Sequence, residues 1–228
     1  PIIAGSQDPL LDWALQESGS DLAMLACGSV DGLEHLADGR ALGASLHLLD
    51  VETGEYNVAA IRRALSMCEV VALNWAWREQ GLVVAPGNPL GISAITDLKN
   101  TGARVIHRQD GSGSELLLRR LLVQAGHNMD DLSVIDETAK SETDLGLAVL
   151  DGRADAGLAV AAVACRLKLE FITLAQERFD IVIGQREYFE TQFQALLEFA
   201  RCDRFDRYAD KLGGYDLTET GRVVYIGP

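Results

Sequence analysis

The chain has few cysteines, prolines, aromatic residues and positive charges, and these shortages exclude several classes of protein. Its four cysteines lie far apart without a Cys-x-x-Cys pair, so no zinc site is expected. Its 20 basic residues stand against 34 acidic ones, and the net charge of −14 disfavours nucleic-acid binding by this segment. The apolar runs are shorter than the ~20 residues that a membrane span needs, and no secretory leader opens the chain.

The remaining composition is typical of a folded protein with substantial cores. Apolar residues make up 48% of 228 positions, enough for one large domain or two lobes. Isolated cysteines in apolar surroundings favour free thiols and a reducing cytoplasm. The chain begins at Pro1 rather than Met, which suggests a processed protein or an excised domain.

Strand-like and helix-like segments alternate along the chain, as in α/β folds with parallel sheets. The expected strands are 2–5, 22–27, 44–49, 70–74, 104–107, 133–135, 156–160 and 180–183. The expected helices are 9–17, 30–37, 58–65, 95–99, 115–125, 144–150 and one long helix around 190–202. Asp8 is the predicted N-cap of the first helix.

One turn sequence occurs twice. Asp38-Gly39-Arg40-Ala41 and Asp151-Gly152-Arg153-Ala154 each end a helix and lead into a strand. The first of these helices is expected to open at Gly28-Ser29 and the second at Thr143. The repetition predicts two similar halves, although two alike βα units could also arise by chance.

A Gly/Ser loop, residues 108–115, joins a strand to a helix. It has neither the Gly-Lys-Ser/Thr ending of a nucleotide P-loop nor a GxGxxG pattern. A strand followed by such a loop and a helix N-terminus offers free N–H groups to an anion. Serines that merely cap a helix after a flexible turn are the alternative.

The polar loops of both halves follow strands, and ligands of parallel α/β sheets bind beyond the carboxyl ends of the strands. Two lobes facing each other would direct four helix N-termini at one site. Donors would come from Ser6, Ser29, Ser112 or Ser114, and Thr143, with Arg108 as the charged group. This donor set favours a small tetrahedral or planar anion.

The predicted lobes are 1–82 with 180–228 and 83–179. Extended segments near residues 81–85 and 179–183 would connect them as a two-strand hinge, so closure on ligand is expected.

Several motifs together resemble one known family, the type 2 periplasmic-binding-protein-like domains, in their molybdate-binding-like branch. The motifs are Gly5-Ser6-Gln7-Asp8-Pro9, His47-Leu48-Leu49-Asp50 with Thr53-Gly54-Glu55-Tyr56-Asn57, Arg78-Glu79-Gln80-Gly81-Leu82, Ala85-Pro86-Gly87-Asn88-Pro89, Arg108-Gln109 with Gly111-Ser112-Gly113, and Asp151-Gly152-Arg153-Ala154-Asp155-Ala156-Gly157. The resemblance implies a two-lobed fold, each lobe a mainly parallel sheet flanked by helices, and binding of molybdate or tungstate. Such domains commonly stand C-terminal to a helix-turn-helix domain or are fused to molybdopterin-biosynthesis proteins.

The resemblance also places the ligand. Ser6, with its neighbour Gln7, and Ser29 match the first-lobe binding positions, while the 108–114 loop and Thr143 match second-lobe positions approximately. The receptors of this family carry a tyrosine just after the second Asp-Ala-Gly strand, where this chain has Leu158-Ala159-Val160-Ala161. Either Arg108 substitutes for that donor or the ligand differs from that of the receptors.

An enzyme is the competing class, but no Gly-x-Ser-x-Gly elbow or triad-like histidine occurs, so we expect no catalytic residues, cofactor or metal. His47 and Asp50 allow a metal-ligand interpretation, although a polar strand end explains them more simply. The predicted function is an oxyanion-sensing effector domain with a DNA-binding domain fused upstream. The alternative is an exported receptor of an ABC transporter for an oxyanion or small carboxylate.

Overall fold

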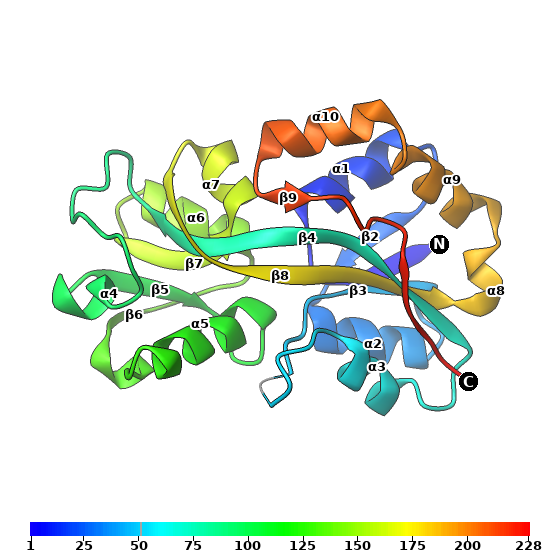
Figure 1. The fold of residues 1–228 in the computed structure, drawn as a ribbon, viewed down its shortest axis with the longest axis horizontal. Helices are drawn as coiled ribbons and strands as arrows, with labels where there is room; N and C mark the ends of the chain where they lie inside the picture. The colour runs from blue at the N-terminus through cyan, green and yellow to red at the C-terminus, as the bar shows by residue number, and fades with distance from the viewer. Residues whose placement is uncertain (51) are drawn as a thin grey trace. The chain divides into compact units, whose positions relative to one another are not determined.

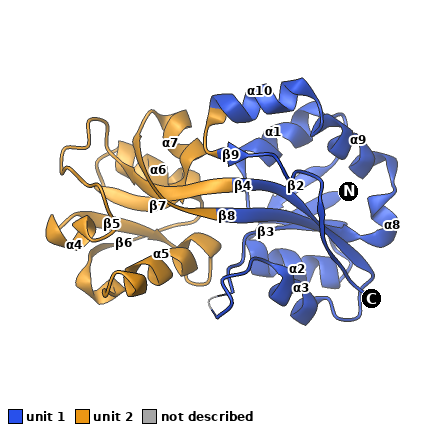
Figure 2. Ribbon diagram, viewed as in Figure 1, with its two compact units in different colours: residues 1–77, 177–211, 215–228 blue, residues 78–176, 212–214 orange. Residues whose placement is uncertain are grey.

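The computed structural model describes residues 1–50 and 52–228, which form two compact units. Unit 1 comprises residues 1–77, 177–211 and 215–228, and unit 2 comprises residues 78–176 and 212–214 (Figure 2). The chain passes between the units within two strands of 15 residues each, β4 (Val70–Val84) and β8 (Glu170–Gly184). The boundaries expected at 82/83 and 179/180 fall in the same two strands.

Unit 1 is built on three parallel strands, because β1 pairs with both β2 and β3 in parallel. β8 joins β3 in the antiparallel sense, and β10 pairs antiparallel with β4. The strands and helices of unit 1 other than β4 and β8 are β1 (Ile2–Gly5), α1 (Pro9–Glu17), β2 (Ala23–Ala26), α2 (Ser29–Ala37), β3 (Gly43–Leu46), α3 (Val58–Ala64), α8 (Gln185–Tyr188), α9 (Thr191–Phe199), α10 (Asp203–Leu212), β9 (Tyr215–Asp216) and β10 (Val223–Ile226). The last residue of α10 belongs to unit 2.

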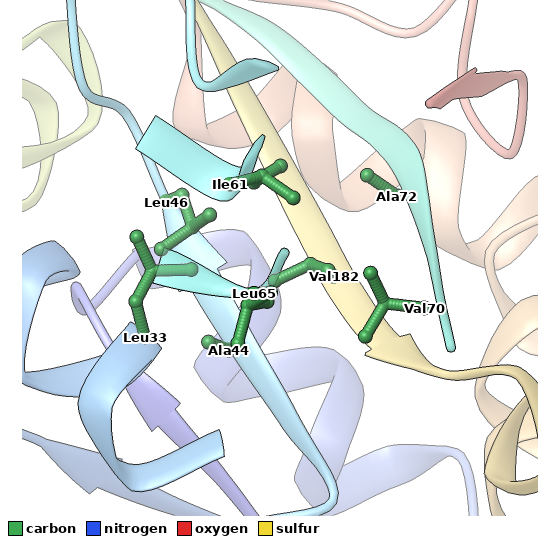
Figure 3. Packing of buried hydrophobic residues seen from close by; sticks show 8 residues of the cluster. All are labelled: Leu33, Ala44, Leu46, Ile61, Leu65, Val70, Ala72 and Val182. Atoms are coloured by element: carbon green, nitrogen blue, oxygen red, sulfur yellow. The ribbon is translucent and has the colours of Figure 1, made fainter. Parts of the chain in front are cut away.

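Helices cover both faces of the unit 1 sheet. Figure 1 shows α2 and α3 on one side and α1, α9 and α10 on the other. The core beneath α2 and α3 is a cluster of aliphatic side chains from these two helices and from β3, β4 and β8 (Figure 3). On the other side, Trp75 of β4 meets Phe205 of α10 edge to face, with ring centroids 5.2 Å apart.

Unit 2 repeats the plan of parallel strands with an antiparallel neighbour. β5 pairs in parallel with β6 and with β7, and β7 pairs antiparallel with β4. The elements of this unit besides its parts of β4 and β8 are α4 (Asp97–Asn100), β5 (Arg104–Arg108), α5 (Gly113–Gln124), the 3-10 helix Met129–Asp131, β6 (Ser133–Ala139), α6 (Glu142–Leu150), β7 (Ala156–Val160) and α7 (Ala161–Leu167).

Most of the expected elements are present, with corrections. β1 and α1 have the predicted bounds, and the Asp8 carboxylate caps α1. The strands predicted at 70–74 and 180–183 are parts of the much longer β4 and β8. The helix expected around 190–202 is present as α9 but ends at Phe199, and the separate helix α10, which starts at Asp203, was not predicted.

Candidate functional site

Two serine hydroxyls meet in unit 1 at the carboxyl ends of the parallel strands. Ser6 follows β1 directly, and Ser29 is the first residue of α2, three residues after β2. Because both strands run in the same direction, their carboxyl ends lie at one edge of the sheet. The two Oγ atoms are 2.8 Å apart, and both side chains are buried.

The backbone of the third parallel strand completes this group. His47 follows β3, and its backbone N–H donates to Ser29 Oγ at 3.2 Å. The two hydroxyls have two protons, and the hydrogen bond between them uses one. The second hydroxyl proton of the pair therefore remains available to a ligand.

The start of α2 adds backbone donors. The N-terminal N–H groups of a helix have no partner within the helix and form its positive end. The N-cap residue of α2 is Gly28, and no side chain caps this helix. By contrast, Asp8 Oδ1 accepts from Leu10 N and Leu11 N at 3.0 and 2.8 Å, so a carboxylate of the protein satisfies the start of α1. The two helix N-termini of unit 1 that were expected to bind the anion are those of α1 and α2. Only the N-terminus of α2 has no side-chain cap.

Glycines explain why α2 can bring Ser29 to Ser6. A Cβ atom at Gly32, in the first turn after Ser29, would stand 2.7 Å from Gly5 Cα and 2.8 Å from the carbonyl oxygen of Ala4. Real side chains do not approach a backbone so closely. Gly32 therefore allows α2 to pack directly against the end of β1.

A buried hydrogen bond between two side chains lies next to the serines. His47 Nδ1 is 3.0 Å from Glu177 Oε2, with both side chains almost inaccessible to solvent. The partner of His47 is thus a residue of β8, 130 positions away, and the metal-ligand interpretation of His47 with Asp50 finds no support. Within residues 1–50 and 52–228, no group of three or more His, Cys, Asp or Glu could hold a metal ion.

In unit 2 the carboxylate of Glu142 accepts a hydrogen bond from Ser114, one of the predicted anion donors. Ser114 Oγ donates to Glu142 Oε1, and Gln80 Nε2 donates to the same oxygen at 3.0 Å. The second oxygen, Glu142 Oε2, accepts from Val160 N at 2.9 Å, at the start of α7. The hydroxyl proton of Ser114 is therefore used in a hydrogen bond to Glu142.

The other predicted residues of unit 2 lie on the same loops. Ser112 caps α5, because its Oγ accepts from Glu115 N at 3.3 Å. Arg108 ends β5 and donates from Nε to Gln109 Oε1 at 3.1 Å. Burial lowers the pKa of Arg108, while the carboxylates of Glu142 and Asp144 act against that shift.

Thr143 and Gln7 are both exposed to solvent. The prediction that the helix opens at Thr143 is wrong, because α6 begins at Glu142 with Ser141 as its cap. Ser141 Oγ accepts from Asp144 N at 3.0 Å and takes the capping role, which leaves Thr143 inside the first turn.

The predicted residues thus fall into two sets, Ser6 and Ser29 in unit 1 and the 108–114 loop with its neighbours in unit 2. Sequence reasoning missed Glu142 and Glu177, which organise the polar groups of the two sets. Glu142 had one local signal, its place in the first turn of a helix after a strand. Glu177 had none, because it lies within a long strand.

Comparison with known proteins places the chain. Residues 13–201 match the PBP superfamily domain, and the chain belongs to this superfamily. The uncharacterized protein YvgK of Bacillus subtilis strain 168 is 32% identical over 197 residues. That match covers 86% of this chain and 63% of the relative, so the chain spans less than two thirds of the relative's length.

Solved structures share the fold at low sequence identity. A protein described as the substrate-binding protein of a phosphate ABC transporter, with bound phosphate, from Clostridium perfringens has a TM-score of 0.70. It is 13% identical, and the match covers 92% of this chain and 96% of that one. The sulfate-binding protein SubI of Mycobacterium tuberculosis has a TM-score of 0.65 at 17% identity, covering 93% of this chain and 85% of SubI. The fold is therefore that of solute-binding proteins, as the sequence motifs implied.

Proposed function

We propose that this chain binds a small tetrahedral oxyanion and that unit 1 holds it at Ser6, Ser29 and the start of α2. The carrying observation is the pair of buried hydroxyls 2.8 Å apart beside a helix N-terminus that no side chain caps. These donors are neutral, and they offer hydrogen bonds without the desolvation that a buried cation would require.

The strength of such a site is adequate for specific binding. Hydrogen bonds to a charged group contribute about 1.5–3 kcal/mol each. One hydroxyl proton and two or three N–H groups of α2 would supply several of them. The chain's net charge of −14 does not prevent this, because local dipoles dominate at short range.

We propose molybdate or tungstate as the ligand, on the strength of the sequence motifs that resemble the molybdate-binding-like branch. Phosphate and sulfate are the competing ligands, because proteins of similar fold are described with them. All four are tetrahedral oxyanions, and they differ in size and in whether they carry a proton near neutral pH.

Isothermal titration of the purified chain with molybdate, tungstate, sulfate and phosphate tests the proposal. We expect one anion to bind clearly more tightly than the others. Ser29→Ala removes a hydroxyl and should lower the affinity for that anion by about 10- to 100-fold. Ser66→Ala, an exposed serine of unit 1, is the matched control and should leave the affinity unchanged. Absence of heat with all four anions, with an unchanged melting temperature, would overturn the oxyanion proposal.

We also propose that the domain acts as the effector part of a cytoplasmic regulator. All four cysteines are free, which suits a reducing compartment. The Bacillus relative continues beyond the matched region, so its length leaves room for a further domain such as a DNA-binding one.

The second candidate is a receptor of an ABC transporter, which the similarity in fold to the phosphate-binding protein from Clostridium perfringens favours. Among the described residues, no helix is long and apolar enough to cross a membrane. Fractionation of cells that make the complete gene product distinguishes the two roles. A regulator stays in the cytoplasmic fraction and is retained on DNA from its own promoter region, whereas a receptor is exported.

A further inference from the structure

Unit 1 contains a second hollow, lined by α2, α3 and residues 48–50, 52 and 57. Its volume is about 560 Å³, within the range of ~300–1,000 Å³ typical of small-molecule sites. Neither Ser6 nor Ser29 is among the described residues that line it. The hollow is therefore separate from the proposed anion site, although α2 contributes to both.

Small side chains on α3 explain why the hollow exists. Ala59, Ala60 and Ala64 face it, where larger residues would fill the groove between the two helices. Opposite them, α2 presents Val30 and Leu33 with helical spacing.

The floor of the hollow is continuous with the core of unit 1. Leu33 belongs to the buried cluster drawn in Figure 3, and Leu48 and Ala60 pack against that cluster. Val30 is half exposed, so the apolar surface reaches the solvent. A ligand that settles here would remove apolar surface from water.

The charged residues around this floor are mainly acidic. Glu34, Asp50 and Glu52 line the hollow, with Arg63 as the single basic residue among the described lining. Hydrogen bonds from the backbone of Thr53 and Glu52 hold the pKa of Asp50 below its usual range, so this carboxylate stays ionised at neutral pH. The lining thus carries three negative charges and one positive charge.

We propose that this hollow is a second ligand site of unit 1 that takes a small organic cation. The apolar body of the ligand would lie on Leu33, Leu48 and Ala60, with an ammonium or guanidinium group toward Glu34 and Glu52. The acidic rim repels an oxyanion, so the two sites of unit 1 select ligands of opposite charge. The inference does not depend on the proposed anion function.

The test uses three probes that share one apolar body, namely 4-phenylbutylammonium, 4-phenylbutan-1-ol and 5-phenylpentanoate. Binding to the purified chain is followed by ¹H–¹⁵N NMR, which also locates the perturbed residues. We expect the cation to bind at least about tenfold more tightly than the carboxylate. The shifts should concentrate in α2, α3 and residues 48–50 and 52.

Two kinds of variant identify the hollow as the site. Ala60→Leu fills it from the floor and should abolish binding of the cation. Ala64→Met fills it from an exposed position, so it keeps the test valid if the floor variant does not fold. Glu34→Gln with Glu52→Gln should reduce the preference for the cation over the alcohol to about one, whereas Glu55→Gln, outside the lining, should not.

Three results would overturn the proposal. The first is no binding of 4-phenylbutylammonium at millimolar concentration. The second is equal binding of all three probes, which would indicate an unselective apolar surface. The third is unchanged binding in Ala64→Met, which would place the cation elsewhere. Oxyanion titration of the same variants reports separately on the anion site, so the two proposals can fail independently.

Discussion

At the scale of single residues, the candidate anion site depends on which partner each polar group has already found. Ser6 and Ser29 satisfy each other and leave one hydroxyl proton over. Ser114 has the same chemistry and also follows a strand, but its hydroxyl donates to Glu142. Two serines that look equivalent in a sequence therefore differ in what they can offer a ligand.

The contact of Gly32 with β1 leads to the first prediction. Gly32→Ala should lower the free energy of unfolding by about 1–3 kcal/mol, because its Cβ would overlap backbone atoms that cannot move aside. The Gly32→Ala change should also weaken binding of the anion, since α2 would have to shift away from Ser6. Urea unfolding and titration measure the two effects.

Glu34→Ala, an exposed change on the same helix, is the control for Gly32→Ala. Its unfolding midpoint should stay close to that of the parent chain. A Gly32→Ala protein of unchanged stability would show that α2 does not rest on β1 as described.

The hydrogen bonds of Glu142 lead to the second prediction. Glu142→Gln replaces one carboxylate oxygen by an NH₂ group, so at least one of three donors loses its acceptor. We expect unfolding to become easier by about 1–3 kcal/mol, the cost of an unsatisfied buried group. Asp130→Asn, on an exposed residue of unit 2, should have almost no effect in the same urea titration. Equal stability of the two variants would contradict the role given to Glu142.

At the scale of elements, the repeated turn is the clearest agreement between sequence and structure. α2 has its C-cap at Asp38 and α6 at Asp151, and the following glycines have φ angles of +68° and +71°. The backbone bonds match as well. Arg40 N and Ala41 N both donate to His35 O, just as Arg153 N and Ala154 N both donate to Ala148 O. Glycine favours this turn because it adopts positive φ without a steric penalty.

After the second turn, an ion pair ties β7 to β5. Arg104 Nη2 lies 2.7 Å from Asp155 Oδ1, and Asp155 also bonds to the backbone N–H of Arg104 at 2.8 Å. The hydrogen bond from the Arg104 side chain is the main cause that lowers the pKa of Asp155. A carboxyl whose folded pKa is depressed stabilises the fold above its unfolded pKa of about 3.9 and loses that contribution as the pH falls.

Asp155→Asn should therefore destabilise the chain at pH 7 by at most about 1 kcal/mol, because the Arg104 side chain is half exposed and solvent screens the pair. The difference from the parent chain should shrink as the pH falls below the unfolded pKa of about 3.9 toward the lower folded pKa. Urea unfolding at several pH values measures it. A gap that stays constant or widens toward acid would contradict this account. Asp136→Asn, on an exposed residue of the same unit, is the control.

At the scale of the whole molecule, no covalent cross-link contributes to stability, because all four cysteines are free. Thermal unfolding should consequently give the same midpoint with and without a thiol reductant. A lower midpoint in reductant would show that a disulfide forms in solution. Binding of the anion should raise the unfolding midpoint. At an anion concentration of 100 times the dissociation constant, the folded state gains about 2.7 kcal/mol of stability.

Sequence patterns predicted much of the fold but failed where polar residues are buried within a strand. Asn74, Arg78 and Gln80 interrupt the apolar run of β4, so the pattern indicated a strand at 70–74 and a separate extended segment near 81–85. All three are buried in the folded chain. The side-chain amides of Asn74 and Gln80 reach Asp180 and Glu142, more than 60 residues away, which no local pattern can indicate.

Local sequence patterns are enough to predict the alternation of strands and helices, the cap of α1, the two matching turns and the loops that carry the polar groups. These features depend on residues a few positions apart, and local backbone preferences decide them. The tertiary structure alone decided which donors remain available. His47 meets Glu177 across 130 positions and Ser114 meets Glu142 across 28, and such pairings follow from how the strands assemble.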